Sequence, residues 1–193
     1  MQKQYNTYWP LELDTTENWA YWDNAFSEKE CKEIIDIGNK YILEEGKTTG
    51  SKKEYRKAKI VWLYPYEDTS WIYRRLTDIA NELNNKYFKF QIDGFAEGLQ
   101  FTYYKEPDGK HSKHIDRDKN SFTRKLSIII QLSNPKTYKG GDLLLHIDEP
   151  KTKIEKQIGK LVMFPSYLLH EVTPVVKGER YSLVAWLTGK PFK

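Results

Sequence analysis

His114 and Asp116 are metal-ligand residue types placed two positions apart. On an extended strand, side chains at such spacing point to the same face and can bind one ion, although a His-x-Asp pair alone is a weak signal. His170 adds a third ligand type, just after the apolar run 161–164 and the turn-like Pro165-Ser166. Two imidazoles and one carboxylate can hold Fe(II) on one face and leave positions open for a chelating co-substrate and dioxygen.

The same three ligands would also suit a zinc hydrolase with a bound water, so the triad alone does not select a reaction. Arg180 favours the oxygenase. It lies ten residues beyond His170 at the start of the strand-like run 181–186, and a turn through 176–179 would return it beside His170. A guanidinium there can bind the distal carboxylate of 2-oxoglutarate through two parallel hydrogen bonds. The four residues together predict an Fe(II)- and 2-oxoglutarate-dependent dioxygenase.

The first part of the chain is predicted to form helices, which would support the strands that position these residues. Ser27 and Glu30 form a capping-box pattern, and the apolar residues that follow predict a helix over about 28–45. A second amphipathic pattern predicts a helix over about 70–85. Between the helices, the Gly- and Lys-rich segment 45–59 predicts a mobile loop that enters a strand.

The remainder of the chain has short apolar runs separated by turns. These runs predict strands over 59–63, 94–104, 126–132, 142–147, 160–164, 170–174 and 180–187. The spacing suits an antiparallel sandwich or barrel preceded by packing helices. Residues 1–22 are rich in Trp and Tyr and are expected to form an ordered lead-in strand or wrap on this body.

Length and composition fit one globular domain. The chain has 193 residues, of which 39% are hydrophobic and 15% aromatic. No apolar run reaches the roughly 20 residues that cross a bilayer, and residues 1–10 do not resemble a signal peptide, so a cytoplasmic location without membrane association is expected. The lone Cys31 is expected to be buried. The net charge of +4, without zinc-finger spacing or a recognition helix, argues against a nucleic-acid partner.

Three stretches carry a resemblance to the prolyl-hydroxylase-like branch of the 2-oxoglutarate oxygenases, and the match covers roughly residues 45–190. The stretches are Tyr104–Asp116 (YKEPDGKHSKHID), Leu126–Leu143 (LSIIIQLSNPKTYKGGDL) and Phe164–Trp186 (FPSYLLHEVTPVVKGERYSLVAW). The second and third are similar to bacterial PKHD-type hydroxylases. The first, together with residues 56–62, resembles the oxygen-sensing prolyl hydroxylases.

The resemblance implies a mainly β protein with packing helices (α+β), built as a double-stranded β-helix of the jelly-roll or cupin-like kind, with N-terminal helices supporting the major sheet. Residues 1–193 would form one oxygenase domain, with a catalytic β-core at about 88–190 and a support at about 1–87. The cofactors implied are Fe(II), 2-oxoglutarate and dioxygen, with ascorbate as a further candidate. The sequence contains no internal repeat that would indicate a second domain.

The resemblance also assigns further site residues. Tyr104 would hydrogen-bond 2-oxoglutarate and Trp186 would lie against the iron site, although core packing is the alternative for both. Gln131 occupies a place where relatives often have a Tyr that reaches the co-substrate, and its amide could donate to the same carboxylate. His111 is expected to be an exposed loop residue, and His146 to have an outer or surface role rather than to bind the metal.

The expected substrate is a prolyl residue in a protein or peptide, with the Lys-rich loop 46–58 as a lid. One alternative is hydroxylation of a small molecule or another side chain. A second is a non-catalytic module whose basic residues Lys52, Lys53 and Arg56 bind an acidic partner. A third is a cupin-type metal enzyme that does not use 2-oxoglutarate and tolerates the loss of Arg180.

Overall fold

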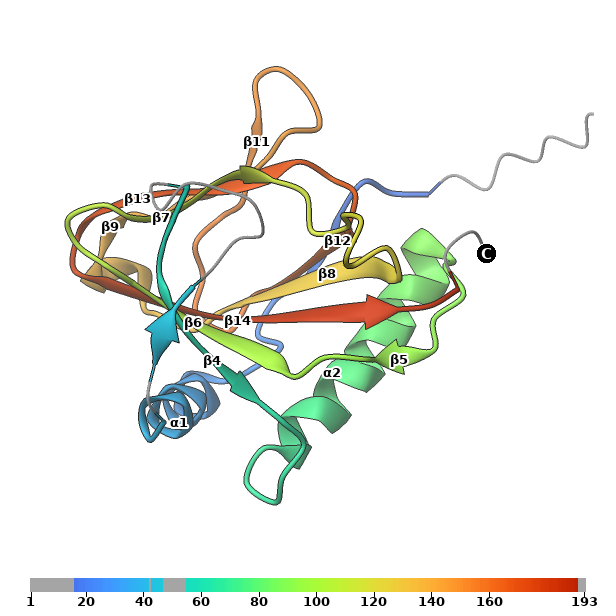
Figure 1. Ribbon diagram of the computed structural model, residues 1–193, viewed down its shortest axis with the longest axis horizontal. Coiled ribbons are helices and arrows are strands. Elements are labelled where there is room, and N and C mark those ends of the chain that lie inside the picture. Colours follow the sequence, from blue (N-terminus) through green and yellow to red (C-terminus); the bar gives the residue numbers. More distant parts are fainter. Residues whose placement is uncertain (1–15, 42, 47–54, 191–193) are drawn as a thin grey trace, which may run out of the picture.

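Two antiparallel sheets face each other in the computed structural model, which describes residues 16–41, 43–46 and 55–190 (Figure 1). In this view the smaller sheet lies at the top, the larger sheet crosses the middle, and the helices lie below it. The arrangement is a double-stranded β-helix, or jelly roll, as the sequence predicts. Residues 1–15 of the predicted lead-in and residues 47–54 of the predicted lid lie outside the described part of the chain.

The larger sheet has the strand order β1-β12-β8-β14-β6-β4-β2, with β5 paired to β14. Its strands are β1 Ala20–Trp22, β2 Glu44–Glu45, β4 Lys59–Leu63, β5 Gly94–Phe95, β6 Leu99–Lys105, β8 Arg124–Gln131, β12 Leu161–Pro165 and β14 Glu179–Thr188. The longest pairing joins β14 to β8 on one side and to β6 on the other. β14 therefore lies in the interior of the sheet.

The smaller sheet has the order β11-β10-β13-β7-β3, with β9 paired to β13. Its strands are β3 Arg56–Lys57, β7 Gly109–His114, β9 Lys139–Gly140, β10 Leu143–Leu145, β11 Thr152–Lys153 and β13 His170–Lys177. The strand pattern did not predict β7, because its sequence GKHSKH contains no apolar residue. The backbone of β7 is nevertheless paired on both sides, by β13 and by β3.

Strand β14 contributes to two separate cores. Leu183 and Leu187 pack in the cluster that includes both helices, whereas Val184 and Trp186 pack in the cluster between the two sheets. The division follows from the strand geometry, since successive side chains point to opposite faces. By the same alternation Arg180 lies on the inner face, where it is 1% exposed.

Helix α1, Glu28–Asn39, begins at the predicted capping box. The Glu30 backbone N–H donates to Ser27 Oγ (3.3 Å), and the Ser27 backbone N–H donates to Glu30 Oε2 (2.8 Å). Cys31 is fully buried on the inner side of this helix, as predicted, and burial raises the pKa of its thiol to about 12.

The prediction that this helix continues to residue 45 was wrong. The Lys40 backbone N–H donates to the Ile37 carbonyl, a three-residue spacing that tightens the last turn at Asn39. The chain then pairs with the edge of the larger sheet, where Glu44 lies opposite Ile60 of β4. Pairing at a sheet edge here outweighs the helical periodicity of the sequence.

Helix α2, Ser70–Leu83, matches the second predicted helix and continues into a π-helical turn, η2, Asn84–Phe88. Its apolar side packs on the outer face of the larger sheet, in the same cluster as α1. A short 3-10 turn, η3 Pro135–Thr137, follows β8. Neither described α-helix has both the length and the apolar character needed to cross a membrane.

The capping box of α1 leads to a pH-dependent prediction. Arg75 lies 2.8 Å from Glu30 and holds the pKa of Glu30 at about 2, below its ordinary 4.5. The contribution of Glu30 to stability is therefore complete above pH 4.5 and is lost as the pH falls toward 2. We expect Glu30→Gln to lower the free energy of unfolding by up to about 1 kcal/mol at pH 7. The deficit should shrink below pH 4.5.

Urea unfolding at pH 7 and pH 3 would measure this difference. Glu28→Gln is the control, because it removes a carboxylate from the same turn that has no ion pair with Arg75 among the described residues. A deficit for Glu30→Gln of the same size at both pH values would contradict the prediction.

Candidate metal centre

The two predicted histidine ligands are brought together by strand pairing. His114 ends β7 and His170 begins β13, and the two residues lie directly opposite each other in the antiparallel register. Their ring centroids are 4.1 Å apart. The two residues are 56 positions apart in the chain, and the register of the smaller sheet makes them neighbours.

Asp116 reaches the same place by another route. The expectation that His114 and Asp116 share one extended strand was wrong, because β7 ends at His114. The backbone N–H groups of Asp116 and Arg117 both donate to the Ser166 carbonyl, at 3.0 and 2.9 Å. These two bonds hold the segment after β7 against the turn after β12. The carboxylate of Asp116 therefore points back toward the two rings.

The three side chains form a compact set of ligand atoms. His114 Nε2 lies 3.5 Å from Asp116 Oδ1, and His170 Nε2 lies 3.6 Å from Asp116 Oδ2. One ligand atom from each residue lies within 4.8 Å of the other two. Among the residues that the structure describes, this is the only group of three or more His, Cys, Asp or Glu side chains that meets this criterion.

Hydrogen bonds fix which nitrogen of each ring faces the centre. His114 Nδ1 lies 2.8 Å from the Ser112 carbonyl, and His170 Nδ1 lies 2.9 Å from the Leu168 carbonyl. A carbonyl only accepts, so the proton of each neutral ring resides on Nδ1. Both Nε2 lone pairs are then free to bind a metal, which is the usual role of such outer hydrogen bonds.

The electrostatic environment favours the ligand forms of these groups. Burial lowers the pKa of His170 to about 4, so its ring is neutral at pH 7. Burial works to raise the pKa of Asp116, but the neighbouring imidazoles hold it well below its usual range. Ser127 Oγ also donates to Asp116 Oδ2 at 2.7 Å. Asp116 is therefore an anion in a buried site, as cation binding requires.

A cavity of about 480 Å³ opens onto the triad. Its wall contains all three ligand residues together with Tyr104 and Trp186. The cavity is large enough for a small molecule or the side chain of a peptide.

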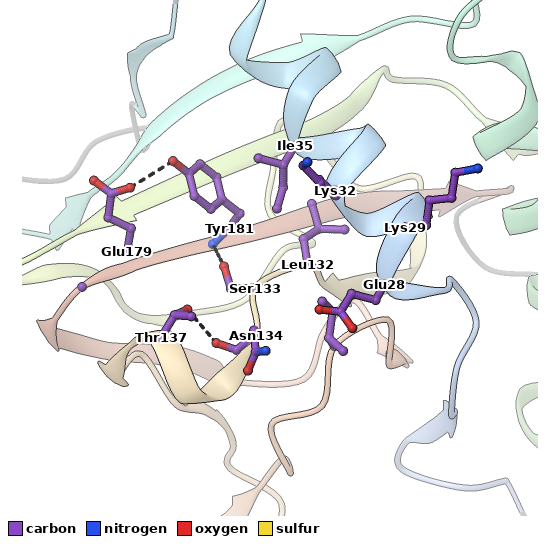
Figure 2. A pocket seen from close by; sticks show the side chains of 12 residues that line it. Glu28, Lys29, Lys32, Ile35, Leu132, Ser133, Asn134, Thr137, Glu179 and Tyr181 are labelled. Atoms are coloured by element: carbon purple, nitrogen blue, oxygen red, sulfur yellow. Dashed lines mark hydrogen bonds between the residues drawn. The ribbon is translucent and has the colours of Figure 1, made fainter.

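A second hollow of about 810 Å³ lies outside the barrel, between α1 and the start of β14 (Figure 2). Lys29 and Lys32 of α1 line one side, and Ser133, whose Oγ accepts the Tyr181 backbone N–H at 2.7 Å, lines the other. Ile35 of α1 also lines it. This hollow contains none of the predicted site residues, so the candidate site is the cavity inside the barrel.

Arg180 lies on the inner face of β14, directly opposite Tyr104 of β6. Its guanidinium carbon is 5.1 Å from the centroid of the Tyr104 ring, and Nη1 donates to Ser182 Oγ at 3.2 Å. Nη2 is buried and has no hydrogen-bond partner among the described residues. A buried guanidinium with a free donor is costly unless an anion binds it, so the site fits the carboxylate that Arg180 is predicted to hold.

The Gly140-Gly141 pair at the end of β9 makes room for Arg180. Gly140 and Gly141 have φ angles of +72° and +63°, which glycine adopts without a steric penalty. A Cβ on Gly141 would lie 2.9 Å from Arg180 Cδ. Any larger residue at this position would push the guanidinium out of its present place.

The residues assigned by resemblance occupy different parts of the inner face. Tyr104 is 3% exposed and lines the cavity, and Trp186 lines it with its ring 3.9 Å from the Arg124 guanidinium carbon. Gln131 is buried on β8, opposite Ser182. Its amide nitrogen donates to the Glu155 carbonyl at 2.8 Å, so this donor is already engaged. The roles of all three toward a co-substrate stay predictions.

The expectation that His111 is an exposed loop residue was wrong. His111 lies in β7, and its ring stacks on His114 with centroids 3.5 Å apart. Burial lowers the pKa of His111, so this ring is neutral. His146 does not join the triad and instead lies 3.0 Å from Glu171 Oε1.

The sequence reasoning missed residues that support the site. Arg124 donates to the Asp116 carbonyl at 3.1 Å and pairs with both carboxylate oxygens of Glu97. Tyr138 is buried beside Arg180, and burial raises the pKa of its hydroxyl while the guanidinium works to lower it. Alternation along β8 could have indicated Ser127, which lies two residues before Ile129 on the inner face. No local pattern indicates Arg124 or Tyr138.

Residues 99–188 match the family model of the 2OG-Fe(II) oxygenase superfamily. A PKHD-type hydroxylase of Prochlorococcus marinus (strain MIT 9211) is 36% identical over 115 residues, which cover 56% of this chain and 52% of that relative. The aligned part of the chain thus spans about half the length of this relative. The matched region contains the triad and Arg180.

Solved structures of low sequence identity have the same fold. A prolyl-4-hydroxylase from Pseudomonas putida aligns with a TM-score of 0.73 at 22% identity, covering 91% of this chain and 94% of that one. A prolyl hydroxylase from Trichoplax adhaerens, in complex with a hypoxia inducible factor oxygen degradation domain peptide fragment, aligns with a TM-score of 0.75 at 19% identity, covering 90% and 84%. The resemblance that the three sequence stretches indicate is confirmed.

The geometry predicts that His170 is required for metal binding. We expect His170→Ala to weaken Mn(II) binding by more than about 100-fold, since even outer partners of metal ligands contribute 10- to 100-fold. Isothermal titration calorimetry with Mn(II) would measure this. His146→Ala is the control, because His146 is bound to Glu171 and lies outside the triad. Equal affinities of His170→Ala and wild type would rule out this site.

Proposed function

We propose that the chain, whose residues 99–188 match the family model of the 2OG-Fe(II) oxygenase superfamily, is an Fe(II)- and 2-oxoglutarate-dependent dioxygenase that hydroxylates its substrate. The observation that carries the proposal is the convergence of His114, Asp116 and His170 in a cavity beside Arg180, whose buried Nη2 has no partner among the described residues. A zinc hydrolase would have no use for that guanidinium.

The triad would hold Fe(II) through the two Nε2 atoms and the Asp116 carboxylate, the donor set of non-haem iron oxygenases. When bound, iron, 2-oxoglutarate and dioxygen supply the oxidising chemistry that converts a C–H bond to C–OH with release of succinate and carbon dioxide. Ser127 holds Asp116 as an oriented anion, and the Ser112 and Leu168 carbonyls hold the two rings. These residues fix the ligand geometry before a metal arrives.

Arg180 would bind the distal carboxylate of 2-oxoglutarate. The inner face of the barrel excludes water around it, because Arg180 is 1% exposed and Tyr104 covers one side of its guanidinium. Charge-assisted hydrogen bonds are strong in such a dry site. Tyr138, also buried beside Arg180, is a further donor that could reach the same carboxylate.

The proposed substrate is a prolyl residue in a protein or peptide. The support is the similarity of fold to prolyl hydroxylases, one of them in complex with a peptide fragment, and the open cavity beside the triad. The PKHD-type relatives leave the substrate open, so the second candidate is a small molecule or another side chain. We propose one oxygenase domain for residues 1–193, with ascorbate as a reductant that keeps the iron divalent.

Loss of Arg180 should separate this function from a metal enzyme that does not use 2-oxoglutarate. We expect Arg180→Ala to raise the KM for 2-oxoglutarate by about 100-fold or more, because two charge-assisted hydrogen bonds are lost. Arg180→Lys should recover only part of the loss, since a lysine lacks the planar fork. Succinate formation by the Fe(II)-loaded chain is the measurement.

Two controls accompany this experiment. Arg74→Ala removes an exposed guanidinium and should leave the KM unchanged. Mn(II) binding by each Arg180 variant reports whether the buried substitution has left the metal centre folded. Normal 2-oxoglutarate turnover by a folded Arg180→Ala variant would exclude the proposed role.

The substrate class is tested with a library of proline-containing peptides. We expect particular peptides to stimulate succinate formation and to gain the mass of one oxygen atom, since hydroxylation couples the two events. His114→Ala, which removes a triad member, should abolish both signals. Stimulation by small molecules but by no peptide would favour the second candidate.

A further inference from the structure

Arg56 places an unpaired positive charge in the wall of the same cavity. It lines the cavity with His111 and His114. Its Nε and Nη2 atoms are buried and have no hydrogen-bond partner, and Arg56 forms no ion pair among the described residues. Arg56 is partly buried, and leaving two buried N–H groups of a cation without an acceptor is costly, so this edge of the guanidinium is suited to bind an anion.

The pairing of β3 with β7 sets the position of Arg56 relative to the metal centre. Arg56 lies directly opposite His111 in the antiparallel register, so the two side chains share one face of the smaller sheet. The His111 ring in turn stacks on His114 with centroids 3.5 Å apart. Only one ring therefore separates the guanidinium from a ligand of the triad.

The groups around Arg56 cannot neutralise it. His111 lies opposite Arg56, but an imidazole carries no negative charge and cannot neutralise a guanidinium. The described carboxylates near this wall already have other partners. Asp108 pairs with Lys57 and Lys110, Glu97 pairs with Arg124, Asp118 accepts from Ser121, and Asp116 belongs to the triad. No carboxylate of the described residues is therefore available to Arg56, and a bound molecule would supply the anion.

The two unpaired atoms also indicate the shape of that anion. Nε and Nη2 lie on the same edge of a guanidinium, and their N–H groups run parallel, which matches the two oxygens of a carboxylate. Gly46 packs closely here, since a Cβ on it would lie 2.8 Å from Arg56 Nε. A larger residue at position 46 would displace this edge.

Resting on the oxygenase function proposed above, we propose that Arg56 binds a carboxylate of the substrate and thereby positions the reacting C–H bond at the metal centre. The carboxylate is either an acidic side chain of a peptide or the carboxylate of a small molecule. This role differs from that proposed for Arg180, which would bind 2-oxoglutarate. Arg56 lies on β3 of the smaller sheet, whereas Arg180 lies on β14 of the larger sheet.

The test measures binding without turnover. The chain loaded with Mn(II) and 2-oxoglutarate is titrated with matched pairs of probes. Binding is followed by the change in intrinsic tryptophan fluorescence, to which Trp62 and Trp186 in the cavity wall contribute. One set of pairs is proline peptides with Glu or Gln at each flanking position. The other pair is free L-proline and L-prolinamide. The two sets distinguish a side-chain carboxylate from that of a small molecule.

We expect at least one acidic probe to bind about tenfold or more tightly than its amide counterpart. Arg56→Gln should abolish this preference, and Arg56→Lys should retain part of it because the charge remains. Lys59→Gln removes an exposed charge three residues away and should retain the preference fully. Mn(II) uptake by the Arg56 variants confirms that the metal centre is folded.

Two outcomes would overturn the inference. In the first, no acidic probe is preferred over its amide by the wild-type chain. In the second, Arg56→Gln retains the preference, or weakens only the affinity for 2-oxoglutarate. Failure of the proposed oxygenase function is recognised by a separate measurement. A wild-type chain that forms no succinate from 2-oxoglutarate with Fe(II) would contradict that function, whichever probes it binds.

Discussion

The candidate metal centre depends on the antiparallel pairing of β7 with β13, which places His114 opposite His170. One histidine alone would not form the site. Each ring is oriented by a backbone carbonyl two residues earlier in the chain. Asp116 is added by two backbone hydrogen bonds to Ser166. The ligand set is thus fixed mainly by hydrogen bonds to main-chain carbonyls, which do not depend on the identity of the accepting residues.

The inner face of the barrel carries charges that would destabilise most protein interiors. Arg180 and Asp116 are almost fully buried, and Arg56 has two buried nitrogen atoms without partners among the described residues. The opposite face of the same strands compensates, since it packs an apolar cluster against α1 and α2. Fully burying one large apolar side chain stabilises a fold by roughly 1.5–3 kcal/mol. The helices therefore supply stability that allows the barrel interior to remain polar.

The sequence predicted the parts of this protein that leave a local pattern. Apolar alternation located the strands that carry His170 and Arg180, and the capping box located the start of α1. It could not locate β7, whose stability comes from pairing on both sides rather than from apolar residues. For the same reason the sequence placed His111 in an exposed loop.

Long-range contacts account for the remaining differences. Arg124 reaches the Asp116 carbonyl, Glu97 and Trp186 at once, and Tyr138 lies beside Arg180. No spacing in the chain predicts either arrangement, because the partners come from separate strands and loops. The end of α1 at Asn39 has a similar cause, since pairing of Glu44 with Ile60 competes with the helical pattern.

The two-sided character of β14 links the integrity of the fold to its chemistry. A slip of one residue in its register would exchange every side chain between the faces. Arg180 would then enter the apolar layer beneath the sheet, and Leu183 would take a place inside the barrel. Such a misfolded chain would lose stability and the arrangement of the candidate site together. A chain with this register error would therefore be open to degradation, rather than accumulate as a compact form with a displaced site.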